Sequence, residues 1–178
     1  MKLLLISNST NAGETYLNHP KEQMKDFLGK KPVNALFVPY AGVTFSYDDY
    51  EKKVEERFSE MGHHIMSIHR CADPIKAVEE AEAIVVGGGN TWKLVQMLHH
   101  HRLMEVIRRK TLAGTPYIGW SAGSNIACPT LRTTNDMPII HPVSFDTLNL
   151  IPFQINPHYL DAHPENHEIG RASCRERV

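Results

Sequence analysis

Y-I-G-W-S-A-G-S-N, residues 117–125, joins a short apolar run to a segment of helical character through a glycine-rich turn. Its centre, Gly119-Trp120-Ser121-Ala122-Gly123, fits the pattern G-x-S-x-G, in which a serine occupies a sharp turn between a strand and a helix. The flanking glycines permit a turn too tight for Cβ atoms, so the serine side chain should project from the top of a sheet. The stretch therefore predicts a strand–turn–helix unit of an α/β domain.

Outward from this unit, short apolar runs alternate with segments of helical periodicity. The predicted strands are Lys2–Ser7, Val33–Pro39, Ile65–Ile68, Glu82–Val86 and Pro116–Gly119. The predicted helices are Lys21–Leu28, Tyr47–Met61, a short one from Pro74, one from Thr91 to about His100, and Leu103–Leu112. This alternation predicts an α/β fold with a parallel sheet and helices on both faces. Because such sheets bind ligands beyond the carboxyl ends of their strands, the glycine-rich turns 87–89 and 119–123 should share one rim.

Composition excludes several classes of function. The 178 residues suit a single domain, and 42% hydrophobic with 22% charged residues is an ordinary globular balance. Lys plus Arg (19) nearly cancels Asp plus Glu (20), so no basic surface is expected to bind nucleic acid or an anionic membrane. The apolar run at the start is too short for a signal peptide, and no run could span a membrane, so we expect a cytoplasmic protein. Cys71, Cys128 and Cys174 lack the spacing of a disulfide framework or a thiolate metal site.

Ser121 is the candidate nucleophile. A serine hydroxyl needs a base within hydrogen-bond reach and a donor for the oxyanion. The start of the helix after Ser121 would direct backbone N–H groups toward that oxyanion. A glycine- and serine-rich turn without chemistry is the alternative interpretation of the same residues.

The choice of base depends on position, because the chain contains 11 histidines. The run 99–101 comes near a helix end and suits a solvated terminus better than a metal site. His158 stands in Asn156-Pro157-His158, within a loop-rich region that follows Cys128, and Pro157 would stiffen the approach to its imidazole. Other histidines of that region remain alternatives, namely His141, His163 and His167. Those flanking the third predicted strand are interpreted as structural, namely His63, His64 and His69.

Two further segments could complete such a site. Asp136, in T-T-N-D-M-P at 133–138, is a candidate carboxylate, although a turn or capping role is the alternative interpretation. The segment 87–91, G-G-G-N-T, lacks both common nucleotide-binding patterns, so no nucleotide cofactor is expected. Its exposed backbone amides are better suited to donate a second hydrogen bond to an oxyanion.

Taken together, segments of this chain resemble the peptidase E family, peptidase family S51 of the class I glutamine amidotransferase-like superfamily. The resemblance runs in order from residue 1 to about residue 167, and a set of matching segments is far more specific than one motif. The segments are 3–10, 37–44, 68–70, 85–91, 117–125, 132–138 and 154–159.

The resemblance implies a flavodoxin-like, glutaminase-like fold and a serine peptidase without metal or cofactor. The implied substrate is a small peptide, a dipeptide with an N-terminal aspartate (Asp-X). Ser121 matches the family's nucleophile and His158 its general base, while Gly89 and Ala122 match the oxyanion-hole positions. Asp136 matches an acidic position proposed as third member of the relay. A glutamate further toward the C-terminus is the rival, and this chain ends before it.

From about residue 168, the sequence E-I-G-R-A-S-C-R-E-R-V stops resembling the family. We therefore expect one α/β hydrolytic domain over 1–167, incomplete at its C-terminus, followed by a foreign-looking tail at 168–178. On this interpretation, whether this chain is active is open. Two alternatives to the dipeptidase remain: a cyanophycinase-like hydrolase of β-aspartyl linkages, and an inactive binding domain. The segments R-T-T-N-D-M-P and N-P-H favour the dipeptidase.

Overall fold

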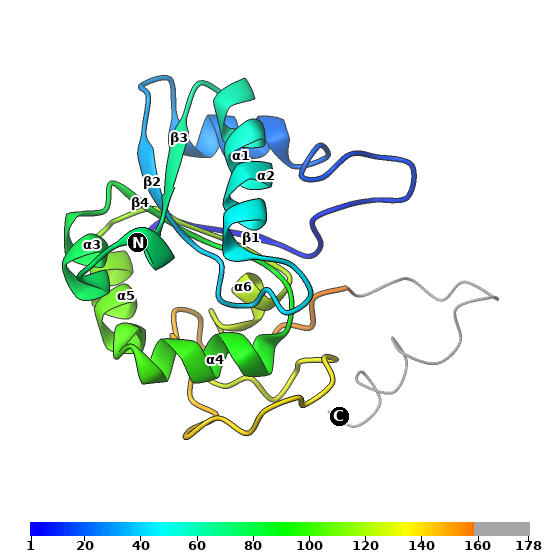
Figure 1. Cartoon of the computed structure of the whole chain (residues 1–178), viewed down its shortest axis with the longest axis vertical. Coiled ribbons are helices and arrows are strands. Elements are labelled where there is room, and N and C mark those ends of the chain that lie inside the picture. Colours follow the sequence, from blue (N-terminus) through cyan, green and yellow to red (C-terminus); the bar gives the residue numbers. More distant parts are fainter. Residues whose placement is uncertain (159–178) are drawn as a thin grey trace.

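The computed structural model describes residues 1–158, and the helices and strands predicted from the sequence are present at or near their predicted bounds (Figure 1). The strands are β1 (Leu3–Ile6), β2 (Asn34–Val38), β3 (His64–Ser67), β4 (Ala83–Val86) and β5 (Tyr117–Trp120). The helices are α1 (Lys21–Leu28), α2 (Tyr47–Glu60), α3 (Pro74–Glu80), α4 (Thr91–His100), α5 (Leu103–Leu112) and α6 (Ala122–Asn125), with a 3-10 turn η1 (Ile68–Arg70) after β3.

The strands form one parallel sheet in the order β1-β5-β4-β2-β3, which confirms the predicted α/β class. β5 lies between β1 and β4, because Gly119 pairs with Leu5 on one side and with Val86 on the other. The carboxyl ends of these three strands are therefore neighbours. As predicted, the two glycine-rich turns that follow β4 and β5 share one rim.

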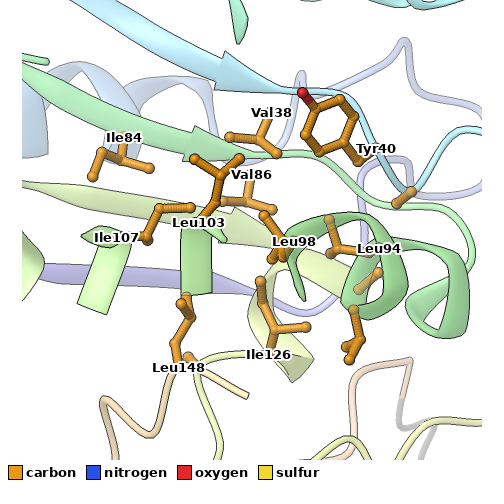
Figure 2. Close-up of a cluster of buried hydrophobic side chains, with 14 of the residues drawn as sticks. Val38, Tyr40, Ile84, Val86, Leu94, Leu98, Leu103, Ile107, Ile126 and Leu148 are labelled. Atoms are coloured by element: carbon orange, nitrogen blue, oxygen red, sulfur yellow. The ribbon is translucent and has the colours of Figure 1, made fainter. Parts of the chain in front are cut away.

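Both faces of the sheet are covered by helices. Strand β4 is buried at every position, and its side chains alternate between the faces, with Ile84 and Val86 on one and Ala83 and Val85 on the other. Residues of α3, α4 and α5 pack on the first face. Figure 2 shows leucine and isoleucine side chains of α4 and α5 on the side of the sheet that carries Ile84 and Val86. Helices α1 and α2 cover the second face. Full burial of each valine, leucine or isoleucine side chain in these clusters stabilises the fold by roughly 1.5–3 kcal/mol.

The helices begin where the sequence provides capping residues. The Ser46 hydroxyl accepts a hydrogen bond from the N–H of Asp49 at the start of α2 (3.0 Å). Asn90 caps α4 in the same way, through the N–H of Lys93 (3.0 Å). These caps orient the helices whose first turns reach the rim of the sheet.

Residues 129–158 contain neither helix nor strand beyond an isolated bridge between Thr130 and Asp146, as their prolines predict. This segment crosses below α4 and returns to the rim beside β1 and β5 (Figure 1). Across the described residues, 1–158, we find no helix with the length and apolar character required to cross a membrane.

Candidate active site

Ser121 occupies the turn between β5 and α6 with φ 54° and ψ −115°. An L-residue rarely adopts this conformation, which costs of order 1–3 kcal/mol when the surrounding structure imposes it. The turn is held by the N–H of Ser121, which donates to the carbonyl of Ile6 (3.0 Å). It also requires Gly123, because a Cβ there would collide with the carbonyl oxygen of Val86. The structure thus confirms the strand–turn–helix unit predicted from G-x-S-x-G.

Ser121 and His158 lie in hydrogen-bond contact, although 37 positions separate them in the sequence. The distance from Ser121 Oγ to His158 Nε2 is 2.7 Å. The backbone of His158 is held by Ser7, at the end of β1, whose hydroxyl accepts the N–H of His158 (2.9 Å). The structure therefore brings the predicted nucleophile and base to a distance at which a proton can pass between them.

The segment before His158 is tied to helix α6, which follows the nucleophile. Asn125 of α6 is buried, and its side-chain amide donates to Thr133 Oγ1 (2.8 Å). The Thr133 hydroxyl in turn donates to the carbonyl of Ile155. A second link joins Asn135 Nδ2 to Asn156 Oδ1 (2.8 Å). Loop 132–138 thus holds the segment that carries His158 in place through these hydrogen bonds.

Asp136 lies beside the same cavity, but its carboxylate caps helix α4. Its Oδ2 accepts the N–H of Thr91 (2.7 Å), the hydroxyl of Thr91 (2.6 Å) and the hydroxyl of Thr134 (3.0 Å). A negative charge at this position is favoured by the helix dipole. No hydrogen bond links Asp136 to His158 in the described part of the chain. The capping contact was the alternative interpretation from the sequence, and a role in the relay stays a prediction.

The two predicted oxyanion donors face no competing acceptor. Within residues 1–158, the backbone N–H groups of Gly89 and Ala122 make no hydrogen bond. Gly89 has φ 136°, a conformation that favours glycine. The loop packs against the nucleophile, because a Cβ placed on Gly88 would lie 2.9 Å from Cβ of Ser121. These two amides are therefore free to donate to an oxyanion formed at Ser121, and that role stays a prediction.

A cavity of about 580 Å³ opens beside Ser121 and His158. Lys53 of α2 is the one lysine or arginine of residues 1–158 that lines it, and its ammonium lies 4.2 Å from the ring centroid of Tyr16. No ion pair joins Lys53 to another described residue. Carboxylates of Asp49 and Asp136 also reach the cavity. Its remaining lining residues are Ser9, Thr10, Tyr16, Phe45, Tyr50, Gly88, Gly89 and Trp120.

Comparison with known proteins decides the family. The model of peptidase family S51 matches residues 3–174. The chain belongs to peptidase family S51.

Similar proteins agree with this assignment. Peptidase E of Nostoc sp. is 52% identical over 166 residues, which cover 93% of this chain and 69% of that protein. Peptidase E of Salmonella paratyphi A is 47% identical over 168 residues, which cover 94% and 73%. In fold, the S51 chain matches a Listeria monocytogenes protein described as a candidate peptidase E, with TM-score 0.76, 24% identity and coverage of 98% and 86%. A peptidase from an acI-B1 actinobacterium has TM-score 0.65, 19% identity and coverage of 88% and 68%.

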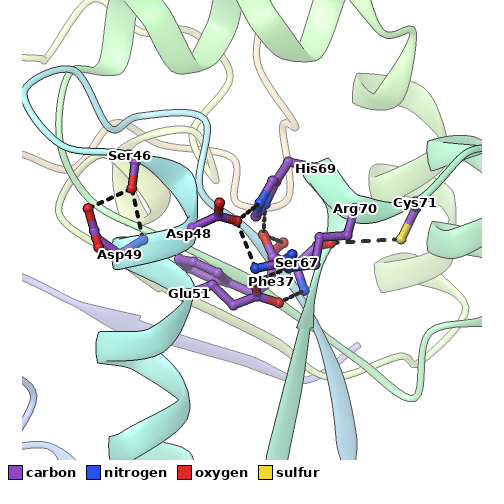
Figure 3. Close-up of polar contacts among 9 residues, drawn as sticks. All are labelled: Phe37, Ser46, Asp48, Asp49, Glu51, Ser67, His69, Arg70 and Cys71. Atoms are coloured by element: carbon purple, nitrogen blue, oxygen red, sulfur yellow. Dashed lines mark hydrogen bonds and ion pairs between the residues drawn. The ribbon is translucent and has the colours of Figure 1, made fainter.

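Away from the cavity, the S51 chain carries an ion-pair network at the start of α2 (Figure 3). Atoms of Asp48, Glu51 and His69 lie within 4.8 Å of one another, close enough to hold a metal ion. The guanidinium of Arg70 contacts both carboxylates, at 2.7 Å from Asp48 and 2.5 Å from Glu51. The hydrogen bond from His69 and the charge of Arg70 lower the pKa of Asp48. The cluster therefore already contains its counter-charge, and it fastens α2 to η1 after β3.

The other candidate histidines either do not line the cavity or lie outside the described residues. The run 99–101 ends α4, as the sequence predicted, and His99 Nε2 contacts a backbone carbonyl there (3.0 Å). His141 Nδ1 contacts the carbonyl of Pro142 (3.0 Å). His163 and His167 lie outside residues 1–158. Among the described histidines, His158 is the one that lines the cavity with Ser121.

Sequence reasoning missed the residues that hold the site together. Ser7 supports His158, and Asn125 and Thr133 connect the histidine segment to α6. Of these residues, only Ser7 could have been placed from the sequence, because it lies at the carboxyl end of a predicted strand and therefore on the rim of the sheet. Polar residues such as Thr133 occur in every loop, and only the folded chain shows which of them are buried.

Proposed function

We propose that this S51 chain is a serine dipeptidase that hydrolyses peptides with an N-terminal aspartate. The observation that carries the proposal is the 2.7 Å contact between Ser121 Oγ and His158 Nε2 at the edge of the cavity. Membership of a peptidase family and similarity to proteins named peptidase E support the substrate class. The proposal includes the cytoplasm as compartment and a small peptide as partner.

In this mechanism, His158 Nε2 takes the Ser121 proton while Oγ attacks the peptide carbonyl carbon. The carbonyl oxygen becomes an oxyanion, which accepts hydrogen bonds from the N–H groups of Gly89 and Ala122. The imidazolium then gives its proton to the leaving amine, and the carbon–nitrogen bond breaks. Water hydrolyses the resulting aspartyl ester with His158 again as base, which restores the Ser121 hydroxyl.

The charges around the cavity are complementary to an N-terminal aspartate. The cavity volume lies within the range of small-molecule sites, roughly 300–1,000 Å³. Lys53 has no ion-pair partner among residues 1–158 and can meet the substrate's β-carboxylate. The carboxylates of Asp49 and Asp136 can meet its α-ammonium group. A substrate with an uncharged first residue would leave the Lys53 ammonium unpaired in the occupied cavity, and the binding of such a substrate is therefore disfavoured.

Asp136 remains our candidate for a carboxylate that acts in the reaction. Its Oδ2 is engaged by Thr91 and Thr134. Its Oδ1 makes no hydrogen bond within the described residues and can serve either the imidazole or the substrate's α-ammonium. Both roles require the charge to be present, so the neutral isostere Asp136→Asn should impair turnover.

The proposal is tested by assaying Asp-Leu, Asn-Leu and Leu-Asp with the wild-type chain and with Ser121→Ala. We expect Asp-Leu to be hydrolysed much faster than Asn-Leu and Leu-Asp. In Ser121→Ala we expect a loss of at least about 10³-fold, since the removal of a nucleophile costs several orders of magnitude. Hydrolysis by the alanine variant at the wild-type rate would exclude Ser121. Equal rates on Asp-Leu and Asn-Leu would exclude aspartate specificity.

A further inference from the structure

A buried tyrosine on α2 connects the nucleophile turn to the glycine loop. Tyr50 is 5% exposed, and its hydroxyl makes three hydrogen bonds. The partners are Trp120 Nε1 (3.2 Å), the hydroxyl of Tyr16 (3.3 Å) and the carbonyl oxygen of Gly88 (3.0 Å). Trp120 directly precedes Ser121, and Gly88 directly precedes Gly89. One hydroxyl therefore links the residues just before the nucleophile and just before the oxyanion donor.

The direction of these hydrogen bonds is set by chemistry. An indole N–H can only donate, so Tyr50 accepts from Trp120. A carbonyl can only accept, so Tyr50 must donate its own proton to Gly88. Burial raises the pKa of Tyr50, so this proton is retained at neutral pH. The hydroxyl is thus a fixed donor aimed at one peptide group.

That peptide group joins Gly88 to Gly89. The described chain contains no cis peptide bonds, and in a planar trans peptide the C=O and N–H point in opposite directions. With glycine on both sides, the peptide has little intrinsic restraint against flipping. A flip would turn the carbonyl oxygen toward the position of the oxyanion and repel it. The hydrogen bond from Tyr50 holds the carbonyl on the other side.

We propose that Tyr50 is a positioning residue that keeps the Gly89 N–H turned toward the oxyanion formed at Ser121. This inference rests on the proposed function, because it takes Gly89 as an oxyanion donor. It also gives a reason for the first glycine of the loop. A Cβ on Gly87 would lie 2.5 Å from the Tyr50 hydroxyl and would push the ring away from Gly88.

The test is Tyr50→Phe, which removes the hydroxyl and keeps the ring. The matched control is Val54→Ala, one turn further along α2, which weakens the core on the same face of the sheet without touching the loop. Each variant is assayed for kcat and KM on Asp-Leu, for inhibition by an aspartate aldehyde whose adduct carries the oxyanion, and for thermal unfolding. Assays are run below the unfolding transition of the less stable variant.

We expect Tyr50→Phe to lower kcat by about 10- to 100-fold, less than the 10²–10³-fold that loss of a whole oxyanion donor costs. KM should change by less than about threefold, and aldehyde affinity should fall with kcat. Val54→Ala should keep both constants near wild-type values despite its lower unfolding temperature. A kcat within about threefold of wild type in Tyr50→Phe, or an equal loss in both variants, would overturn the inference.

If Tyr50→Phe does not fold, Trp120→Phe gives a second route, because it removes the donor that orients the Tyr50 hydroxyl. A smaller loss in kcat with unchanged KM supports the inference, and an unchanged kcat contradicts it. Failure of the proposed function has a different signature. In that case the wild-type chain itself would not cleave Asp-Leu, or Ser121→Ala would remain active.

Discussion

Replacing Ser121 by glycine should abolish hydrolysis and yet give a more stable protein than replacing it by alanine. Both substitutions remove the hydroxyl and its 2.7 Å contact with His158, so that loss cancels between them. They differ in the backbone, because alanine must still adopt φ 54° and ψ −115°, whereas glycine reaches this region without a steric penalty.

The magnitude follows from two opposing contributions. Relief of backbone strain favours glycine by about 1–3 kcal/mol. The greater freedom of glycine in the unfolded chain disfavours it by about 0.5–1 kcal/mol. The expected net difference is about 1 kcal/mol in favour of Ser121→Gly. For a chain of this length, that corresponds to roughly 2–4 °C in the unfolding temperature.

Urea unfolding at neutral pH measures the difference, provided that the two variants share one slope of free energy against denaturant. The matched control is Ala113→Gly, an exposed position at the end of α5 with an ordinary φ of −71°. There glycine should destabilise by about 0.5–1 kcal/mol. If Ser121→Gly were less stable than Ser121→Ala by the same amount as this control, the argument for strain at the nucleophile would be refuted.

Three further outcomes are expected. Lys53→Met should lower the preference for Asp-Leu over Asn-Leu, measured as the ratio of kcat/KM values, by at least about tenfold, as expected for loss of a charged contact worth about 1.5–3 kcal/mol. The control, Lys52→Met at an exposed position, should leave this ratio unchanged, and the same ratio in Lys53→Met as in wild type would contradict the role of Lys53. Asp136→Asn should lower kcat/KM by at least about tenfold, and it should reduce the free energy of unfolding by about 1 kcal/mol because it weakens the cap of α4. Wild-type kinetics in this variant would show that Asp136 takes no part in the reaction. His63 is 1% exposed with neither ring nitrogen hydrogen-bonded within residues 1–158, and burial lowers its pKa below the ordinary 6.5. The unfolded chain binds the His63 proton first as the pH falls, so its contribution to stability is present above pH 6.5 and lost below it. Urea unfolding should show that the free energy of unfolding falls less between pH 7 and pH 5 in His63→Phe than in wild type. An identical fall in both proteins would exclude this contribution of His63.

The fold could be predicted because its helices and strands are encoded locally. Helix α2 begins at a serine cap and ends one residue before Met61-Gly62, with buried residues at helical spacing between them. Ile68 shows the limit of such reasoning, since an apolar β-branched residue after β3 was assigned to the strand but begins η1 instead. Strand order was not predicted either. It is set by which apolar faces meet in the folded chain, and short apolar runs do not encode their neighbours.

For the site, local pattern identified Ser121 most directly, because a serine in a sharp turn between glycines is a local feature. The base had to come from a distant segment, and among 11 histidines the only local reason to prefer His158 was the stiffening effect of Pro157. What distinguishes His158 is tertiary: its backbone binds Ser7 at the end of β1, and β1 pairs with β5, which carries the nucleophile. The same logic applies to Tyr50, which lies in an ordinary helical pattern and gains its role only where α2 meets the ends of β4 and β5. Local sequence therefore marks the strained residue, while the residues that orient its partners are chosen by the packing of the rim.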